Sequence, residues 1–278
     1  MNRVSHGRIA MLDSGLGGLT VLSALRALRP DADVYYFADT AHVPLGDRSL
    51  AEIEEIGRRN VAHLMAYDPS AIVLACGSTC SAFDAFGAPE LPVPLIGVVE
   101  PGSREAAAVS TSGRIGVTAT GATIGSGVFE RSILRARPAA AVTAVPAPAL
   151  VPIIEAGEWD SERARRAVAL VARPIAAARC DALILGCTHF PHVRNWFEEA
   201  LGPTVILVDP AVATAREAAA ALGTPTGAAG RLIVGVSGDA QAFAEAAARL
   251  SGVTIDELRH VAAVQPRHAA AEPSEQMK

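Results

Sequence analysis

The segment Asp181-Ala-Leu-Ile-Leu-Gly-Cys-Thr-His-Phe-Pro191 has the pattern of a short buried strand that ends in a sharp turn. Residues 182–185 form an apolar run of strand length, and Gly186 permits a tight turn of the backbone. The strand is therefore expected to present Cys187, Thr188 and His189 side by side at its end. A neighbouring imidazole favours the reactive thiolate form of a cysteine. The alternative is a buried structural cysteine beside a surface histidine.

A second segment, Ser70-Ala-Ile-Val-Leu-Ala-Cys-Gly-Ser-Thr79, repeats this pattern in the first half of the chain. An apolar strand again leads to a cysteine, Cys76, which is followed by a small polar turn. In open α/β sheets, ligands bind beyond the carboxyl ends of the strands. If the two halves of the chain face each other, both thiols are expected in one cleft.

Strand-like apolar runs alternate along the chain with helical stretches rich in Ala, Leu, Glu and Arg. This alternation predicts an α/β fold made of two pseudo-symmetric α/β domains with mainly parallel sheets and the active site in the cleft between them. The first domain is predicted at residues 1–98 plus 210–262, the second at residues 99–209, and a disordered tail at residues 263–278.

Local signals add three further expectations. Ser49 with Glu52 three residues later is a capping-box pattern, so a long helix is predicted from Ser49 to Tyr67. The stretch 146–152 is expected to be a proline-rich connection. A helix after Asp239 is expected to be the last regular element.

Composition limits the class of protein and its partners. The chain has 278 residues, 50% of them hydrophobic, with a net charge of −5 and a pI near 5.8. It lacks the basic footprint of a nucleic-acid-binding protein, so no nucleic acid partner is expected. No apolar run approaches the ~20 residues of a membrane span. The first residues lack the apolar region of a signal peptide, so we expect a cytoplasmic protein that does not associate with membranes.

The motifs give little support for a metal or a cofactor. Cys76 and Cys80 do not form a CxxC pair, and no histidine cluster accompanies them, so no zinc site is expected. The stretch Gly15-x-Gly17-Gly18 lacks the third glycine of the dinucleotide fingerprint. Cys80 and Cys180 are interpreted as structural.

Two assisted thiols can racemise an amino acid without a cofactor. One thiolate removes the α-proton on one face, and the other thiol returns a proton on the opposite face. Asp13, which follows the first strand, is the carboxylate available to assist Cys76, although an aspartate here can also cap a turn. Glu155 could line the cleft or be a solvated loop residue. Hydroxyls suited to holding the substrate's charged groups are those of Ser14, Ser78, Thr79, Thr120, Thr123 and Thr188.

The chain also resembles the glutamate racemases within the aspartate/glutamate racemase superfamily, in order from about residue 8 to residue 261. Gly186-Cys-Thr-His-Phe-Pro191 is specific, since aspartate racemases typically carry Glu after Cys-Thr. The resemblance implies cofactor-independent interconversion of L- and D-glutamate, which supplies D-glutamate for peptidoglycan, and it implies two α/β domains that commonly form homodimers. The matching motifs are Asp13-Ser-Gly-Leu-Gly-Gly-Leu-Thr-Val21, Tyr36-Phe-Ala-Asp-Thr-Ala-His-Val-Pro-Leu-Gly46, Ala75-Cys76, Gly97-Val-Val-Glu-Pro-Gly102 and Gly186-Cys-Thr-His-Phe-Pro191.

Roles for individual residues follow from this resemblance. Cys76 is implied as the base toward D-glutamate, assisted by Asp13, and Cys187 as the base toward L-glutamate, assisted by His189. Glu155 corresponds to a family glutamate beside His189. The positions implied to contact the substrate are Ser14, Leu45, Gly46, Gly77, Ser78, Thr188 and His189.

Two positions depart from the family pattern. Leu45 stands where the family usually has the Tyr of Pro-Tyr-Gly. Gly77 stands where the family usually has the Asn of Cys-Asn-Thr. Without a gap Ser78 takes the place of the family Thr, whereas with a one-residue insertion Thr79 keeps that role. The alternatives to glutamate are therefore a racemase of aspartate or of another acidic amino acid, and a weakly active or non-catalytic binding protein on the same scaffold.

Overall fold

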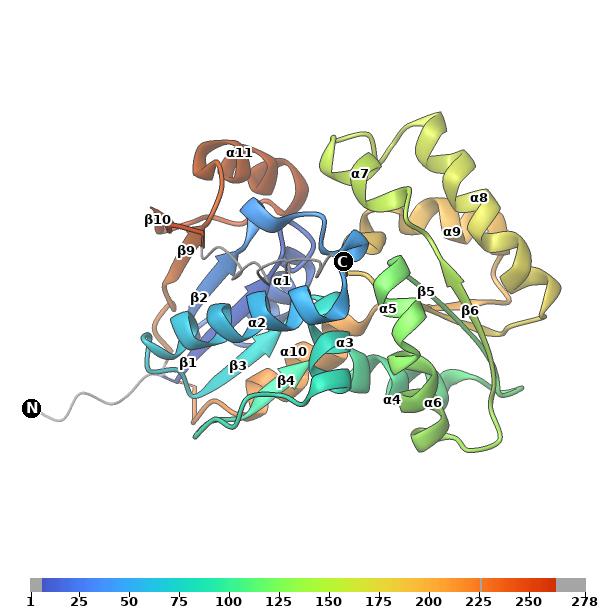
Figure 1. Cartoon of the computed structure of the whole chain (residues 1–278), viewed down its shortest axis with the longest axis horizontal. Coiled ribbons are helices and arrows are strands. Elements are labelled where there is room, and N and C mark those ends of the chain that lie inside the picture. Colours follow the sequence, from blue (N-terminus) through green and yellow to red (C-terminus); the bar gives the residue numbers. More distant parts are fainter. Residues whose placement is uncertain (1–6, 226, 264–278) are drawn as a thin grey trace, which may run out of the picture.

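The computed structural model describes residues 7–225 and 227–263. Within these ranges the strands form two sheets whose ladders are all parallel (Figure 1). Parallel sheets need helical crossovers, which the alternating pattern supplies. The predicted α/β class with parallel sheets is therefore confirmed. The predicted tail at 263–278 lies, apart from residue 263, outside the described residues.

The first sheet has the strand order β10-β9-β2-β1-β3-β4. Its strands come from both ends of the chain: β1 (Arg8–Asp13), β2 (Asp33–Ala38), β3 (Ala71–Leu74), β4 (Leu95–Gly97), β9 (Leu232–Val236) and β10 (Glu257–His260). The helices around it are α1 (Leu19–Leu28), α2 (Leu50–Met65), α3 (Gly77–Phe86), α10 (Pro210–Ala220) and α11 (Ala240–Ser251), with the short 3₁₀ turns η1 (Thr40–His42) and η2 (Leu45–Asp47). Helix α1 packs on α10 and α11, and α2 packs on α3.

The second sheet has the order β6-β5-β7-β8. Its strands are β5 (Arg114–Ala119), β6 (Ala141–Pro146), β7 (Ala182–Leu185) and β8 (Ile206–Val208). The accompanying helical elements are α4 (Val99–Val109), α5 (Gly121–Ser126), α6 (Val128–Ala136), α7 (Leu150–Glu155), α8 (Glu162–Ala177), η3 (Phe190–Val193) and α9 (Arg194–Leu201). In Figure 1 the two sheets lie in separate halves of the molecule, with α5 and α7 at the boundary. The boundaries of the domains stay a prediction.

Of the three predictions made from local signals, one is confirmed, one holds only in part and one is wrong. The predicted capping box forms at α2, where the Ser49 side chain accepts from the Glu52 backbone and Glu52 reaches back to the Ser49 N–H. The expected connection 146–152 is confirmed only for residues 147–149, because residue 146 ends β6 and residues 150–152 form the first half of α7. Proline is tolerated at both places, because Pro146 ends an edge strand and Pro152 lies in the first turn of a helix. The helix after Asp239 is not the last element, since β10 follows it and adds an edge strand to the first sheet.

Neither half of the chain offers an element for crossing a membrane: over the described ranges, no helix combines the necessary length and apolar character.

Candidate active site

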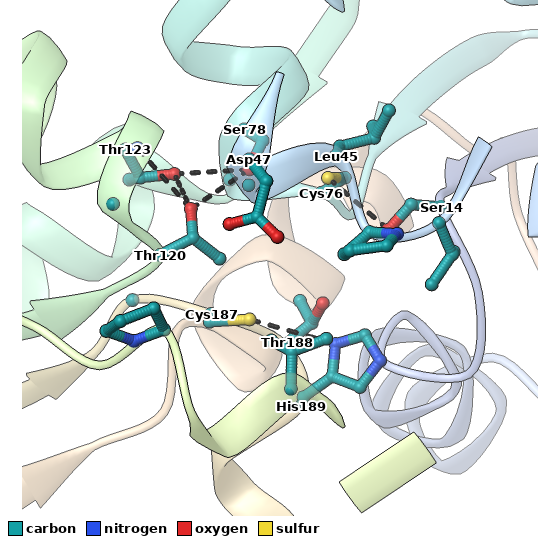
Figure 2. A pocket seen from close by; sticks show the side chains of 18 of the residues that line it. Ser14, Leu45, Asp47, Cys76, Ser78, Thr120, Thr123, Cys187, Thr188 and His189 are labelled. Carbon is teal, nitrogen blue, oxygen red and sulfur yellow. Dashed lines mark hydrogen bonds between the residues drawn. The ribbon is translucent and has the colours of Figure 1, made fainter. Parts of the chain in front are cut away.

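One pocket lies where the carboxyl ends of β1 and β3 face those of β5 and β7, and both predicted cysteines line it (Figure 2). Cys76 comes from the first sheet and Cys187 from the second. Each thiol-bearing residue is almost fully buried, with 6% and 8% of its surface exposed. The fold therefore brings together two cysteines that are distant in sequence, as the strand-end pattern predicts.

Cys76 lies in an acidic and largely desolvated environment. Its Sγ is 3.8 Å from the Ser14 hydroxyl, and Asp13 is completely buried next to it. Burial, followed by the charge of Asp13, raises the pKa of the Cys76 thiol, while hydrogen bonds from the backbone and side chain of Thr79 counteract this increase. A raised thiol pKa makes Cys76 a stronger base once it is deprotonated.

Cys187 belongs to a chain of three polar groups from the second half of the molecule. Its Sγ is 3.7 Å from Nδ1 of His189, and Nε2 of His189 is 2.5 Å from Oε1 of Glu155. Burial alone lowers the pKa of His189, but its hydrogen bonds to Cys187 and Glu155 outweigh that effect and hold the pKa well above its usual value. The imidazolium form is therefore favoured at neutral pH, which places a positive charge beside the Cys187 sulfur.

The two half-sites contact each other directly. Thr188, which follows Cys187, donates its hydroxyl to Oδ1 of Asp13 over 3.3 Å. The other Asp13 oxygen accepts the Gly15 N–H at 2.8 Å, so Asp13 also caps its own turn, as the alternative interpretation allowed. Gly17 must be small here, because a Cβ on it would lie 2.5 Å from Oγ1 of Thr188 and 2.7 Å from Nδ1 of His189. This glycine turn thus lets the first half of the chain pack against the histidine of the second.

Three hydroxyls cluster on one wall of the pocket (Figure 2). Ser78 Oγ lies 3.1 Å from Oγ1 of Thr120 and 3.4 Å from Oγ1 of Thr123, and the two threonine hydroxyls are 3.0 Å apart. Thr79 does not line the pocket. It is 2% exposed, and its backbone and side chain hydrogen-bond to Cys76. Ser78 therefore occupies the pocket-facing position, as expected if the segment after Cys76 aligns with the family pattern without an insertion.

The structure places most predicted site residues around this pocket. Asp13, Thr79 and Glu155 lie behind its lining and contact residues within it. The predicted residues that line it directly are Ser14, Leu45, Gly46, Cys76, Gly77, Ser78, Thr120, Thr123, Cys187, Thr188 and His189.

Several lining residues were not predicted. Asp47 lines the pocket and directs its carboxylate into it in Figure 2. Asp47 directly follows Leu45 and Gly46, which were expected to contact the substrate, so its position in the sequence could have indicated that it lines the pocket. Tyr36 is a further support: it is fully buried and donates its hydroxyl to the Gly15 carbonyl at 2.9 Å. The other unpredicted lining residues are Val43, Pro44, Gly121, Pro148, Val151, Pro152 and Gly186.

No part of the pocket combines groups suited to a metal. Across residues 7–225 and 227–263, no three His, Cys, Asp or Glu side chains are grouped so that they could hold an ion. The residues that surround the two thiols are instead hydroxyl side chains, the carboxylates of Asp13 and Asp47, and the pair formed by His189 and Glu155.

The fold and the site together define a two-domain α/β protein with a pair of thiols facing one buried pocket, and comparisons with known proteins identify its family. A profile of the Asp/Glu/hydantoin racemases matches residues 20–218. The chain is 40% identical to a glutamate racemase from Desulforudis audaxviator, covering 77% of this chain and 79% of the relative. It is 39% identical to one from Symbiobacterium thermophilum, covering 91% of this chain and 94% of the relative.

Solved structures agree with these sequence comparisons. The glutamate racemase isoform RacE1 from Bacillus anthracis superposes with a TM-score of 0.86 at 30% identity, covering 92% of this chain and 97% of that one. The chain therefore belongs to the Asp/Glu/hydantoin racemase family.

The contact between Glu155 and His189 generates a prediction about charge. Replacing Glu155 with Gln removes the negative charge that helps to raise the pKa of His189, so this pKa should fall. A raised histidine pKa stabilises the fold fully below the unfolded value of about 6.5, and that stabilisation is lost as pH rises through the folded pKa. The melting temperature of Glu155→Gln should therefore drop more at pH 6 than at pH 10, and an NMR titration should show His189 deprotonating at a lower pH.

Glu90→Gln is the matched control, because Glu90 is exposed and does not line the pocket. It should change neither quantity. An unchanged His189 titration in Glu155→Gln would contradict the assigned pairing.

Proposed function

We propose that this protein interconverts L-glutamate and D-glutamate without a cofactor, by proton transfer between two cysteines. The observation that supports this most directly is the placement of Cys76 and Cys187 on the lining of one pocket, from opposite sheets, each with its own polar partner. The relatives named glutamate racemase support the choice of glutamate as the substrate.

The two thiols are proposed to act from opposite faces of the substrate's α-carbon. Cys76 is the base toward D-glutamate, supported by Asp13 and Ser14. Cys187 is the base toward L-glutamate, supported by His189. In either direction one sulfur takes the α-proton as thiolate and the other delivers a proton as thiol, so the pair ends with its protonation states exchanged. Glu155 holds the His189 imidazolium in place.

The pocket's polar groups are suited to a zwitterionic dicarboxylate. None of the described lining residues is Lys or Arg, so apart from the His189 imidazolium the carboxylates are held by neutral donors. Ser14 and Thr188 supply hydroxyls near the thiols, and Ser78, Thr120 and Thr123 supply the cluster on the opposite wall. Helix α3 begins at Gly77, on the pocket lining, and a helix N-terminus favours negative charge.

Incubation with L-glutamate in D₂O tests this proposal. The expected result is loss of optical rotation together with incorporation of α-deuterium, in the absence of added pyridoxal phosphate. D-glutamate should react in the same way. Exchange with aspartate alone would point to the alternative substrate class. Lack of exchange with every acidic amino acid would favour a binding protein, which the loss of the usual Asn at position 77 makes conceivable.

The cellular role and assembly are further proposals. D-glutamate made by this enzyme is expected to supply peptidoglycan synthesis in the cytoplasm. A homodimer is expected from the family resemblance, and the mass of the protein in solution by light scattering would test it.

Exchanging each cysteine for serine tests the division of labour. Cys76→Ser and Cys187→Ser should each abolish racemisation or nearly so, because a serine hydroxyl is far too weakly acidic to hold the anionic state. Initial rates in both directions, followed by circular dichroism, measure this. A Cys187→Ser enzyme that racemises glutamate at the wild-type rate would rule out the two-base mechanism.

The remaining cysteines provide matched controls. Cys80 is buried under the first sheet, with its Sγ 3.6 Å from the Leu74 carbonyl, and burial raises its pKa to about 12. Cys180 is also buried, outside the pocket lining. Cys80→Ser and Cys180→Ser should leave racemisation largely intact, and thermal melting should show that all four variants are folded.

A further inference from the structure

Gly77 makes an unusually close contact across the pocket. It is the first residue of α3, on the wall formed by the first sheet. A Cβ on this residue would lie 2.8 Å from the carbonyl oxygen of Gly186, which belongs to the opposite wall. That distance is shorter than real Cβ atoms tolerate. Any side chain at position 77 therefore requires the two walls to move apart.

The Gly186 carbonyl has little freedom to give way. The Gly186 N–H donates to the Thr118 carbonyl at 2.7 Å, which holds the peptide unit directly before this carbonyl at the end of β7. The other side of Gly186 is also crowded, because a Cβ there would lie 2.8 Å from the ring of Phe129, a residue that is 2% exposed. A side chain at position 77 would consequently push against a braced backbone rather than against a flexible side chain.

This contact lies between the two reactive residues. Cys76 directly precedes Gly77, and Cys187 directly follows Gly186. The spacing of the two glycine backbones therefore sets the spacing of the two cysteine backbones on which proton transfer depends. A separation of even a fraction of an ångström lengthens the path of the proton between each sulfur and the substrate's α-carbon.

We propose that Gly77 is a positioning residue that fixes the separation of the two thiols through its contact with Gly186. This inference rests on the two-cysteine function proposed above. It assigns a purpose to the departure from the Cys-Asn-Thr pattern: the absent side chain allows the two walls to come closer together. Simple loss of a polar contact would instead predict that restoring the Asn side chain improves the enzyme.

Gly77→Ala and Gly77→Asn test the proposal. Both should lower kcat in both directions by ~10- to 100-fold, the order of loss caused by small misplacement of reacting groups. For Gly77→Ala the KM for glutamate should stay within about threefold of the wild-type value, since a methyl group removes no hydrogen bond. The primary deuterium isotope effect with α-deuterated glutamate should increase, because proton transfer becomes more strongly rate-limiting.

Gly125→Ala is the matched control. Gly125 lies within α5, and a Cβ on it would meet nothing within 4 Å. The same glycine-to-alanine change should leave kcat, KM and the isotope effect unchanged. A variant that merely folds less well would lose active protein without altering KM or the isotope effect, so these two readouts separate positioning from instability.

Crystal structures of the wild type and Gly77→Ala measure the spacing independently of activity. The proposal expects residues 77 and 186 to be farther apart in the variant. It is overturned if that separation is unchanged, if Gly77→Ala keeps wild-type kcat in both directions, or if Gly77→Asn raises kcat/KM. Failure of the wild type to exchange the α-proton in D₂O would instead reject the proposed function, while the structural comparison would still decide the spacing.

Discussion

The close approach of two backbones across the cleft is the constraint on which this site depends. Thr188 and His189 can pack against the turn after β1 only because Gly17 has no side chain. The same approach allows Thr188 to donate to Asp13, so the carboxylate beside one thiol is also bonded to the half of the molecule that holds the other. Neither half-site is complete without its partner sheet.

Electrostatics gives the two half-sites different characters. Cys76 lies near a buried carboxylate, and burial and that charge raise its pKa. Cys187 lies near His189, whose own pKa is raised by its contacts with Cys187 and Glu155 despite its burial. A negative neighbour favours the protonated thiol and a positive neighbour favours the thiolate. The two sulfurs therefore lie in opposite electrostatic environments, a negative one at Cys76 and a positive one at Cys187.

Much of this could be predicted from the sequence, because strand-end cysteines and parallel α/β alternation are local patterns with a fixed geometric consequence. The elements that escaped prediction have weak local signals: β10 is a half-exposed edge strand, and α3 begins with Gly77, Ser78 and Thr79, which are poor helix formers. The Gly77–Gly186 contact depends on how two distant segments meet, and no window of the sequence contains both. Whether Ser78 or Thr79 faces the pocket depends on the direction of each side chain, which the sequence does not specify.

The absence of Lys and Arg from the described pocket lining has a consequence for reversibility. A Lys or Arg beside a thiol would bind a carboxylate strongly, but it would also lower the thiol pKa and weaken the thiolate as a base toward a very weakly acidic carbon. Hydroxyls and backbone N–H groups hold charge without biasing either sulfur so strongly. Gly77 and Leu45 continue this trend, since each replaces a polar side chain of the family pattern with one that adds no donor. Recognition therefore rests on shape and on the remaining hydroxyls, and the basicity of the two sulfurs stays governed by Asp13 and His189.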